Sequence, residues 1–429
     1  MFRLAYRLLK LIFRLQIRIF YRRRTVLGKD HFRFDGPAIV VVNHPSTLMD
    51  VLNAGVEIRQ EMFFLANYGL FRHPVANWLL RRMYCIPVMR AEDQRPGEER
   101  DNSAAFEASF QRLERGDVLF IAAEGVSWMN RFVRPLKTGA ARIALTAESR
   151  NDWALEVKII PVGLSYSAPD RFRSEVVVQA GAPIYARQWA AAFKTNPEDA
   201  ISAMTTQLEE QLRALTIHTR DEAGEVFIGR LEAIAAQDNP LPAAARFRRS
   251  QFFTARFLDD AALRQAVDAY FDLLKEYKTS DKGVALRNAR RPYRAAMVEA
   301  ALLTLGAPVI LPALAIWFLP CFIPWLMNKS LKLYVGYSAV VKIFFGMITF
   351  PLAIWAVYAA ALRASDSVLA ATAAVGGMVL LGFWGESYLK LIQSMQARMQ
   401  AFRLPAEKAE KLIRMREDIA RRLRTTQED

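Results

Sequence analysis

A histidine and an aspartate stand six residues apart in the segment 43–50, which reads NHPSTLMD. An imidazole exchanges a proton near neutral pH, and a neighbouring carboxylate orients the ring and stabilises the imidazolium as it forms. Within one continuous helix, His44 and Asp50 would lie on different faces. With His44 ahead of a helix start marked by Pro45, the Asp50 carboxylate can reach back to one ring nitrogen. The spacing therefore predicts a general base with its orienting acid, although a lone histidine is more often structural.

Further polar motifs follow in order along the chain. They are LFRHP at 70–74, IPVMR at 86–90, AEGVS at 123–127 with PLKTGA at 135–140, and IPVGLSY at 160–166. Most of these motifs stand at the carboxyl ends of expected strands, where open α/β sheets bind their ligands. We therefore expect them to meet the histidine motif at one edge of a sheet.

This set of motifs resembles the phospholipid/glycerol acyltransferase family. The four blocks of that family are NHxxxxxD or a form one residue shorter, an arginine-containing block, FPEG, and a proline block. The segment 162–181, VGLSYSAPDRFRSEVVVQAG, resembles in particular the branch that contains fungal glycerol-3-phosphate and dihydroxyacetone-phosphate acyltransferases and their bacterial relatives. The longer His–Asp spacing belongs to that branch too. The resemblance covers residues 34–184, and four blocks in order make it specific.

The resemblance implies roles for individual residues. His44 would be the general base for an acceptor hydroxyl that attacks an acyl thioester directly, and Asp50 would orient it. No covalent enzyme intermediate is implied. The substrate-binding residues would be Asn43, Arg72, Arg90, Glu124, Gly125, Lys137 and Pro161.

Several of these binding roles have a chemical rationale within the resemblance. Arg72 and Arg90 would bind the acceptor's phosphate, because a guanidinium binds phosphate as a fork. Lys137 would bind an anion at a helix start, Glu124 would bind the glycerol hydroxyl, and Pro161 would shape the pocket wall. The ordinary alternatives are solvated surface charges for Arg72 and Lys137 and a helix cap for Glu124.

The sequence departs from the family pattern at two places. Ala122-Ala123 replaces the usual Phe-Pro ahead of the glutamate, and Asn67 stands where a basic residue is common. Both departures concern acceptor binding more than the catalytic step.

The predicted function is that of a membrane-bound O-acyltransferase of glycerophospholipid synthesis. Glycerol 3-phosphate, dihydroxyacetone phosphate and 1-acylglycerol 3-phosphate remain open as acceptors. Acyl-CoA or acyl carrier protein would supply the acyl group as a co-substrate, and no bound cofactor or metal is implied. The alternatives are an inactive membrane-surface scaffold with the same fold and acylation of a different lipid acceptor. A nucleic-acid binder is disfavoured, because the arginines alternate with aliphatic side chains rather than with stacking aromatics.

The motifs need a sheet to position them, and residues 28–195 have its pattern. Short apolar runs alternate with helical stretches, which is typical of an α/β fold with a mixed, largely parallel sheet flanked by helices. The expected strands are 38–42, 62–65, 86–89, 118–122, 157–162 and 175–180. The expected helices include 74–83, 102–114 and 138–149.

Residues 1–27 are expected to form an amphipathic basic helix at a membrane surface. Basic residues recur there every three or four positions, and apolar residues fill most of the remaining circumference. Such a helix lies in the headgroup plane, with arginines on anionic phosphates and its apolar side toward acyl chains. The alternative is an ordinary amphipathic helix packed on the domain.

The rest of the chain divides by composition. Residues 196–295 read as a helical appendage without site chemistry, and residues 389–429 as a basic helical tail. Residues 296–388 form a predicted membrane region with apolar runs at 300–327, 343–362 and 367–385. Four prolines in the first run predict a broken, re-entrant element, and the other two runs predict transmembrane helices. A buried soluble bundle is the alternative.

Charge and cysteine content bound the compartment. The formal net charge is +15, which implies an anionic partner, and its placement beside apolar segments favours a membrane. Basic loops flank the apolar runs, so we expect an integral membrane protein with its catalytic domain on the cytoplasmic face. Cys85 and Cys321 are the only cysteines and stand far apart, which favours a reducing compartment.

Overall fold

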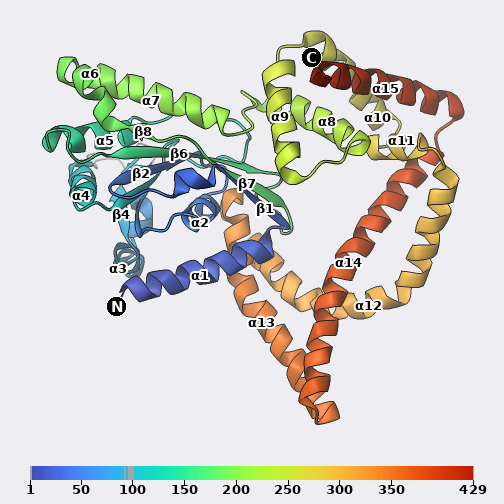
Figure 1. Cartoon of the computed structure of the whole chain (residues 1–429). Coiled ribbons are helices and arrows are strands. Elements are labelled where there is room, and N and C mark those ends of the chain that lie inside the picture. The colour runs from blue at the N-terminus through green and yellow to red at the C-terminus, as the bar shows by residue number, and fades with distance from the viewer. Residues whose placement is uncertain (1, 91–92, 95–100, 429) are drawn as a thin grey trace. The chain divides into compact units, whose positions relative to one another are not determined.

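The computed structural model describes residues 2–90, 93–94 and 101–428. The chain forms two compact units, one of residues 1–221 with 334–340 and one of residues 222–333 with 341–429 (Figure 1). Met1 begins the first predicted segment and Asp429 ends the last one, and both residues lie outside the described part of the chain. The first unit contains all the polar motifs of the sequence.

The first unit is built on one eight-stranded sheet with the order β1-β7-β6-β2-β5-β3-β4, and β8 pairs with β6. Strand β2 runs parallel to both β5 and β6, whereas β7 and β8 pair with β6 in the antiparallel sense. This mixed, largely parallel sheet confirms the predicted fold class. The strands are β1 (Arg23–Leu27), β2 (Ala38–Val42), β3 (Met62–Asn67), β4 (Cys85–Val88), β5 (Val118–Ala122), β6 (Lys158–Tyr166), β7 (Glu175–Ala180) and β8 (Ile184–Tyr185).

Helices cover the two faces of the sheet. Ile39 of β2 and Leu119 of β5 point to one face, where they pack in a core with apolar residues of α4, α5 and α7. Helices α1 and α2 lie on the other face (Figure 1). The helices of this unit are α1 (Phe2–Phe20), α2 (Leu48–Gly55), α3 (Pro74–Arg82), α4 (Ser103–Glu114), α5 (Gly139–Arg150), α6 (Ala190–Thr195) and α7 (Pro197–Ala214).

Both predicted ends of the catalytic region, 28 and 195, are wrong. Residues 23–27 were assigned to the N-terminal helix, but they form β1, which pairs in parallel with β7. The helix ends at Phe20, and the β-branched Thr25 and Val26 favour the extended backbone that follows. At the other end, α7 buries Met204 and Leu208 in the core of the sheet. The first unit therefore continues to residue 221.

Helix α1 exposes its leucines and turns part of its basic stripe toward the protein. Lys10 and Arg14 donate to the carbonyl oxygens of Ile58 and Val56, at the end of α2. Burial, and next the charge of Arg14, lower the pKa of Lys10 to about 8. The exposed apolar side is formed by Leu4, Leu8, Leu11, Leu15 and Ile19. The predicted arrangement, in which the whole basic stripe faces phosphates, is therefore wrong for Lys10 and Arg14, whereas the apolar side is open for contact with acyl chains.

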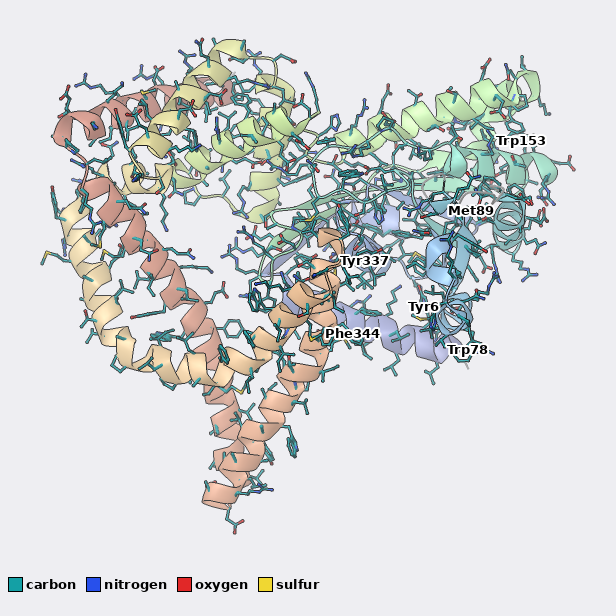
Figure 2. All side chains as sticks on the ribbon, turned by 180° about the vertical axis from the view of Figure 1, so that it is seen from behind. Tyr6, Trp78, Met89, Trp153, Tyr337 and Phe344 are labelled. Carbon is teal, nitrogen blue, oxygen red and sulfur yellow. The ribbon has the colours of Figure 1, made fainter. Side chains whose placement is uncertain are left out.

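The N-terminal end of α1 lies beside α3. Tyr6 packs edge-on against Tyr84, with 5.3 Å between the ring centroids. Figure 2 shows Trp78 of α3 close to Tyr6. Trp78 and the neighbouring Val75 are exposed, so this end of the first unit carries apolar side chains from two helices.

Gly163 of β6 is in close contact with the backbone of Leu215, directly after the end of α7. A Cβ at residue 163 would overlap the carbonyl oxygen of Leu215 and lie 2.7 Å from its carbonyl carbon. Because backbone atoms cannot move aside as a flexible side chain can, Gly163→Ala should lower the free energy of unfolding by about 2 kcal/mol or more. Thermal unfolding would measure the loss. Gly139→Ala is the control, since a Cβ at residue 139 meets nothing within 4 Å. Equal stability of the two variants would contradict the prediction.

The second unit is a helical assembly with its own core. Apolar residues of α8, α9 and α10 pack there with Leu412, Ile419 and Leu423 of the last helix. Residues 389–429 are thus not a separate tail, since α14 continues to Phe402 and α15 is part of this core. The helices are α8 (Glu222–Asp238), α9 (Ala243–Phe257), α10 (Ala261–Glu276), α11 (Asp281–Arg287), α12 (Pro292–Ser330), α13 (Ser338–Ser365), α14 (Val368–Phe402) and α15 (Ala406–Glu428).

A buried arginine fixes α15 in this unit. The Arg416 guanidinium donates to Asp281 Oδ1 at 2.8 Å and to Asp238 Oδ1 at 2.6 Å. Tyr270 donates to the same Asp281 oxygen at 2.9 Å. Because a buried charge is costly without partners, this network specifies one docking position for α15 on α8, α10 and α11.

Three helices of the described chain are long and apolar enough to cross a membrane: α12, α14, and the segment of residues 335–365 that contains α13. The sequence predicted that the prolines of the first run would break it, but α12 is one continuous helix. Figure 1 shows that α12 bends strongly instead. Each proline removes one N–H donor and displaces the preceding turn, which kinks a helix without ending it when the other hydrogen bonds persist. Whether α12 enters and leaves the membrane on one side stays a prediction.

Candidate active site

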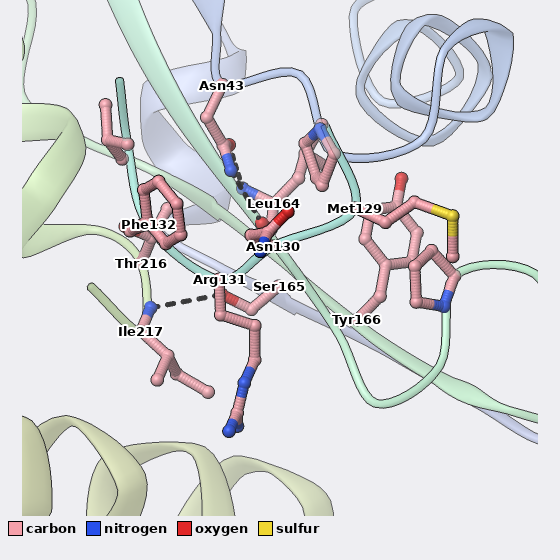
Figure 3. Close-up of a pocket in the computed structure, with 13 residues that line it drawn as sticks. Asn43, Met129, Asn130, Arg131, Phe132, Leu164, Ser165, Tyr166, Thr216 and Ile217 are labelled. Atoms are coloured by element: carbon pink, nitrogen blue, oxygen red, sulfur yellow. Dashed lines mark hydrogen bonds between the residues drawn. The ribbon is translucent and has the colours of Figure 1, made fainter. Parts of the chain in front are cut away.

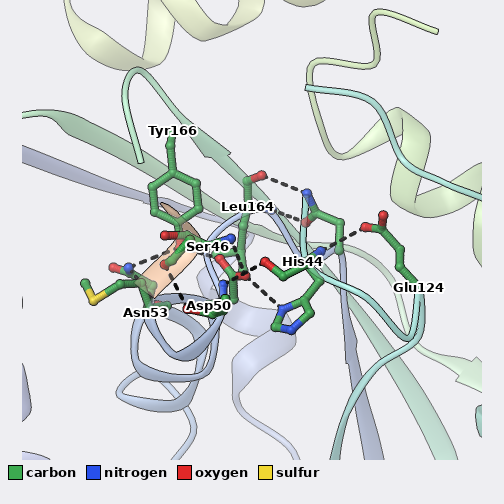
Figure 4. A network of polar contacts seen from close by, with 12 residues as sticks. His44, Ser46, Asp50, Asn53, Glu124, Leu164 and Tyr166 are labelled. Atoms are coloured by element: carbon green, nitrogen blue, oxygen red, sulfur yellow. Dashed lines mark hydrogen bonds and ion pairs between the residues drawn. The ribbon is translucent and has the colours of Figure 1, made fainter. Parts of the chain in front are cut away.

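His44 and Asp50 form the hydrogen-bonded pair that their spacing predicted. Strand β2 ends at Val42 and α2 begins at Leu48, so His44 lies in the connecting loop and Asp50 in the first turn of the helix. The distance from His44 Nδ1 to Asp50 Oδ2 is 3.0 Å (Figure 4). The Asp50 side chain is fully buried, whereas that of His44 is 19% exposed. With Nδ1 directed at the carboxylate, Nε2 is the ring nitrogen that can accept a substrate's proton.

Asp50 is held by two further donors. The backbone N–H of Ser46 donates to Oδ2 at 2.7 Å, and the Tyr166 hydroxyl donates to Oδ1 at 2.7 Å. Burial raises the pKa of Asp50, although the hydrogen bonds from these groups and from His44 oppose that rise. Burial and the adjacent Asp50 carboxylate raise the pKa of Tyr166 well above its ordinary value, so its hydroxyl remains a donor. Sequence reasoning recognised Tyr166 only as part of the proline block.

Asn53 extends this network away from His44. Its side-chain amide donates to the Met49 carbonyl at 2.9 Å and lies 3.3 Å from the Tyr166 hydroxyl and 3.4 Å from the Tyr21 hydroxyl. All of these side chains are buried. The network therefore fixes the orientation of the Asp50 carboxylate toward His44.

Tyr166→Phe should move the acid limb of the pH–rate profile to higher pH. Loss of the hydroxyl removes one of the hydrogen bonds that oppose the rise in the pKa of Asp50, so the carboxylate becomes more basic and stabilises the protonated imidazole more strongly. A hydrogen bond to a charged group supports a shift of roughly half a pH unit or more. The profile of kcat/KM for the acceptor between pH 5 and 9 would measure the shift.

Tyr21→Phe is the matched control for the Tyr166 variant. It removes a hydroxyl of the same buried network that makes no hydrogen bond to Asp50. A merely structural effect would lower the rate of both variants and leave both profiles in place. That outcome would contradict the role of Tyr166 as a positioning residue.

The loop between His44 and Asp50 contains a strained residue, Thr47. Its φ of 46° and ψ of −121° are rare for a β-branched residue. Its N–H donates to Ser127 Oγ at 3.1 Å, and its hydroxyl donates to the Gly336 carbonyl at 2.9 Å. Tyr334 closes the arrangement by donating to the Ser127 carbonyl at 2.8 Å. Residues 334–340 thus belong to the site, which no local pattern in the sequence indicated.

Glu124 holds the backbone of the loop. Its Oε1 accepts the N–H of His44 at 2.8 Å, and its Oε2 accepts the N–H of Arg134 at 3.3 Å. The residue is only 5% exposed, and burial raises its pKa. This contact was not among the predicted roles, which were binding of the glycerol hydroxyl and helix capping. Gly125 beside it has a φ of 78°, which a side chain would strain.

Asn43 and Pro161 both have a structural place at the centre of the sheet. The Asn43 side-chain amide accepts from the N–H of Leu164 at 2.7 Å and donates to its carbonyl at 2.9 Å. The amide thereby ties the end of β2 to β6, and its role in substrate binding stays a prediction. Pro161 lies where β6 changes partner from β8 to β7, a position that requires no donor on that side.

Arg72 and Arg90, the two arginines predicted to bind phosphate, both donate hydrogen bonds to Asp93. The Arg90 guanidinium contacts both carboxylate oxygens of Asp93, at 2.7 and 2.9 Å, and also the Gly125 carbonyl at 2.6 Å. Arg72 donates to the backbone carbonyl of Asp93 at 2.9 Å. The charge of Arg90 is therefore compensated by a carboxylate. Lys137 is exposed and lies against Gly125.

A small hollow opens beside the site. It is lined by Asn43 and Pro45, by the segment 129–133, and by residues 164–166 of β6 (Figure 3). Tyr166 contributes to the lining and also contacts Asp50 through its hydroxyl. The hollow and the His44–Asp50 pair thus share a wall.

The site and its sheet have the pattern of a known family. The family model Acyltransferase matches residues 23–165, which include β1 and most of β6. Residues 23–165 therefore match the acyltransferase domain that the motifs predicted. The matched segment contains His44, Asp50, Glu124 and Lys137.

Two curated relatives come from Saccharomyces cerevisiae. Glycerol-3-phosphate O-acyltransferase 2 is 26% identical over 239 residues, which are 53% of this chain and 32% of the relative. Glycerol-3-phosphate O-acyltransferase 1 is 32% identical over 124 residues, which are 28% of this chain and 16% of the relative. The chain thus spans about a third or less of the length of these relatives.

A solved structure with a likeness to this chain is the 1-acyl-sn-glycerophosphate acyltransferase from Thermotoga maritima. Its sequence is 18% identical, the match covers 50% of this chain and 80% of that one, and the TM-score is 0.37. At this level the likeness adds nothing to the sheet topology described above.

Proposed function

We propose that the protein is a membrane-bound O-acyltransferase that transfers a fatty acyl group from a thioester to the hydroxyl of a phosphorylated glycerol acceptor. The observation that carries this proposal is the pair of His44 and Asp50, 3.0 Å apart, with the carboxylate buried and the histidine partly exposed. This is the geometry of a general base with its orienting acid. The match to the acyltransferase family model and the activity in the names of the yeast relatives support it.

The proposed step is a direct acyl transfer. His44 Nε2 takes the proton of the acceptor hydroxyl, and the oxygen forms a bond to the thioester carbonyl carbon. The carbon–sulfur bond then breaks, and the departing thiolate receives the proton, so an ester and a free thiol are the products. Asp50 stabilises the imidazolium between the two transfers. The thioester would be acyl-CoA or acyl-ACP, used as a co-substrate without a bound cofactor.

The membrane would be both the support of the enzyme and the source of its acyl chain. The leucine side of α1 is exposed, and three helices are long and apolar enough to span a bilayer. A helix with an exposed apolar side and flanking arginines binds an anionic membrane surface. We place the catalytic unit on the cytoplasmic face, because the basic segments flank the apolar helices.

Among the acceptors, we propose glycerol 3-phosphate ahead of dihydroxyacetone phosphate and 1-acylglycerol 3-phosphate. The support is the resemblance of residues 162–181 to one branch of the family and the names of the two yeast relatives. The test is release of free thiol by the purified protein in liposomes, with a long-chain acyl thioester and each acceptor in turn. Release that depends on glycerol 3-phosphate is the expected result.

Two other outcomes of this assay would change the proposal. Faster release with 1-acylglycerol 3-phosphate or dihydroxyacetone phosphate would contradict the choice of acceptor and keep the reaction. Absence of transfer to every acceptor, by protein that still floats with liposomes, would favour the inactive scaffold or a lipid acceptor of another kind.

A further inference from the structure

We propose that Arg134 binds the phosphate group of the acceptor, a role that rests on the proposed function. Arg134 lies in the segment between β5 and α5, and its backbone N–H donates to Glu124 Oε2 at 3.3 Å. The other oxygen of that carboxylate holds the N–H of His44 at 2.8 Å. One buried carboxylate therefore fixes the backbone of Arg134 relative to that of the proposed base.

The Arg134 guanidinium is stacked on an aromatic ring. Its central carbon lies 4.2 Å from the ring centroid of Trp128 and 5.2 Å from that of Phe132. Trp128 in turn donates its backbone N–H to the carbonyl of His44 at 3.1 Å. Stacking on a tryptophan holds the guanidinium in one plane and leaves its edge for a ligand.

Arg134 has no acidic partner among the residues that the structure describes. No ion pair joins it to a described carboxylate, and its buried Nε has no hydrogen-bond acceptor there. Arg90, by contrast, is paired with both oxygens of Asp93. The two terminal nitrogens of Arg134 are not among the buried atoms that lack a partner, so they are the ones that an incoming anion with several oxygens would meet.

Phosphate is the anion that suits this arrangement. A planar guanidinium binds two phosphate oxygens as a fork, and Lys137, three residues further on and exposed, can supply a second positive charge. Every acceptor considered for this enzyme carries one phosphate group and a hydroxyl or its equivalent. With the phosphate on Arg134, the hydroxyl end of such a molecule is free to extend toward His44. The binding site so defined was not assigned by the sequence motifs, in which Arg134 has no place.

The test compares Arg134→Gln, Arg134→Lys and Arg82→Gln. Arg82 is the matched control, because its guanidinium also stacks on a tryptophan, 4.3 Å from the centroid of Trp78, but on α3. We expect Arg134→Gln to raise the KM for glycerol 3-phosphate at least tenfold while kcat and the KM for the acyl thioester change less than threefold. Arg134→Lys should recover part of the loss, since lysine keeps the charge without the fork. Arg82→Gln should behave as the wild type.

Binding measured without turnover separates this proposal from the proposed function. Calorimetric titration with glycerol 3-phosphate, and with inorganic phosphate as a competitor, should give at least tenfold weaker binding for Arg134→Gln than for the wild type. Binding that weakens in this way without any acyl transfer would support the phosphate site and contradict the enzyme. Acyl transfer with unchanged KM and unchanged phosphate binding in Arg134→Gln would overturn the phosphate site. The same holds if the variant loses only its flotation with anionic liposomes, which would assign Arg134 to lipid headgroups.

Discussion

Replacement of His44 with alanine should lower the rate of acyl transfer by roughly 10³-fold, the largest effect expected of any single side chain in this protein. The imidazole is the group that accepts the hydroxyl proton, and its Nδ1 is already committed to Asp50 at 3.0 Å. The neighbouring carboxylates of Asp50 and Glu124 are buried and engaged in hydrogen bonds, so neither replaces it as a base. The measurement is thioester consumption with saturating acceptor.

The control for this experiment is His73→Ala. His73 precedes α3, is exposed, and makes no side-chain cap to that helix. We expect near-normal turnover from the His73 variant and an unchanged melting temperature for both. Turnover within tenfold of the wild type by folded His44→Ala protein would remove His44 from the role of general base.

Asp50→Asn should have the second largest effect, a loss of about 10²-fold in kcat. Asparagine keeps the volume and can still accept a hydrogen bond from His44, but it carries no charge to stabilise the imidazolium. The residual activity should therefore show an acid limb displaced to lower pH. The acid limb of Tyr166→Phe is expected to move in the opposite direction. The two variants together therefore test whether the charge of Asp50 sets the position of the acid limb.

Because Asp50 is buried, Asp50→Asn could lose activity by unfolding rather than by loss of the carboxylate's role in catalysis. Asp50 accepts hydrogen bonds from Ser46, His44 and Tyr166, and an amide in its place can satisfy most of these if Tyr166 reorients. Circular dichroism and the melting temperature would establish that the protein is folded. Folded Asp50→Asn protein with wild-type kcat and an unmoved acid limb would show that the carboxylate has no part in catalysis.

The sequence was informative where local signals determine structure. The continuous apolar run 38–42 and the proline at 45 place His44 in a loop after a buried strand, and Asp50 then falls in the first turn of α2. That is why their contact was predictable from spacing alone. The same applies to β5 and β7, whose apolar runs coincide with the strands of the structure.

What escaped sequence reasoning depends on contacts between distant residues. Gly336 supplies a hydrogen-bond acceptor for Thr47 across 289 positions of the chain, and Tyr166 reaches Asp50 across 116. The pairing of Arg90 with Asp93 is likewise not visible in the motif that contains Arg90. Spacing cannot reveal such partners, because the fold brings them together only after the sheet and its loops have formed.

The placement of residues 334–340 in the first unit has a practical consequence for anyone who wishes to express the catalytic part alone. A chain ended after residue 221 would include the whole sheet but would lack the carbonyl that accepts the Thr47 hydroxyl and the phenol that binds Ser127. The strained turn between His44 and Asp50 would then lose two of its supports. Truncation after residue 221 would remove part of the candidate site together with the three long apolar helices. A version of the first unit without the apolar helices would therefore have to carry the heptapeptide 334–340 on a linker.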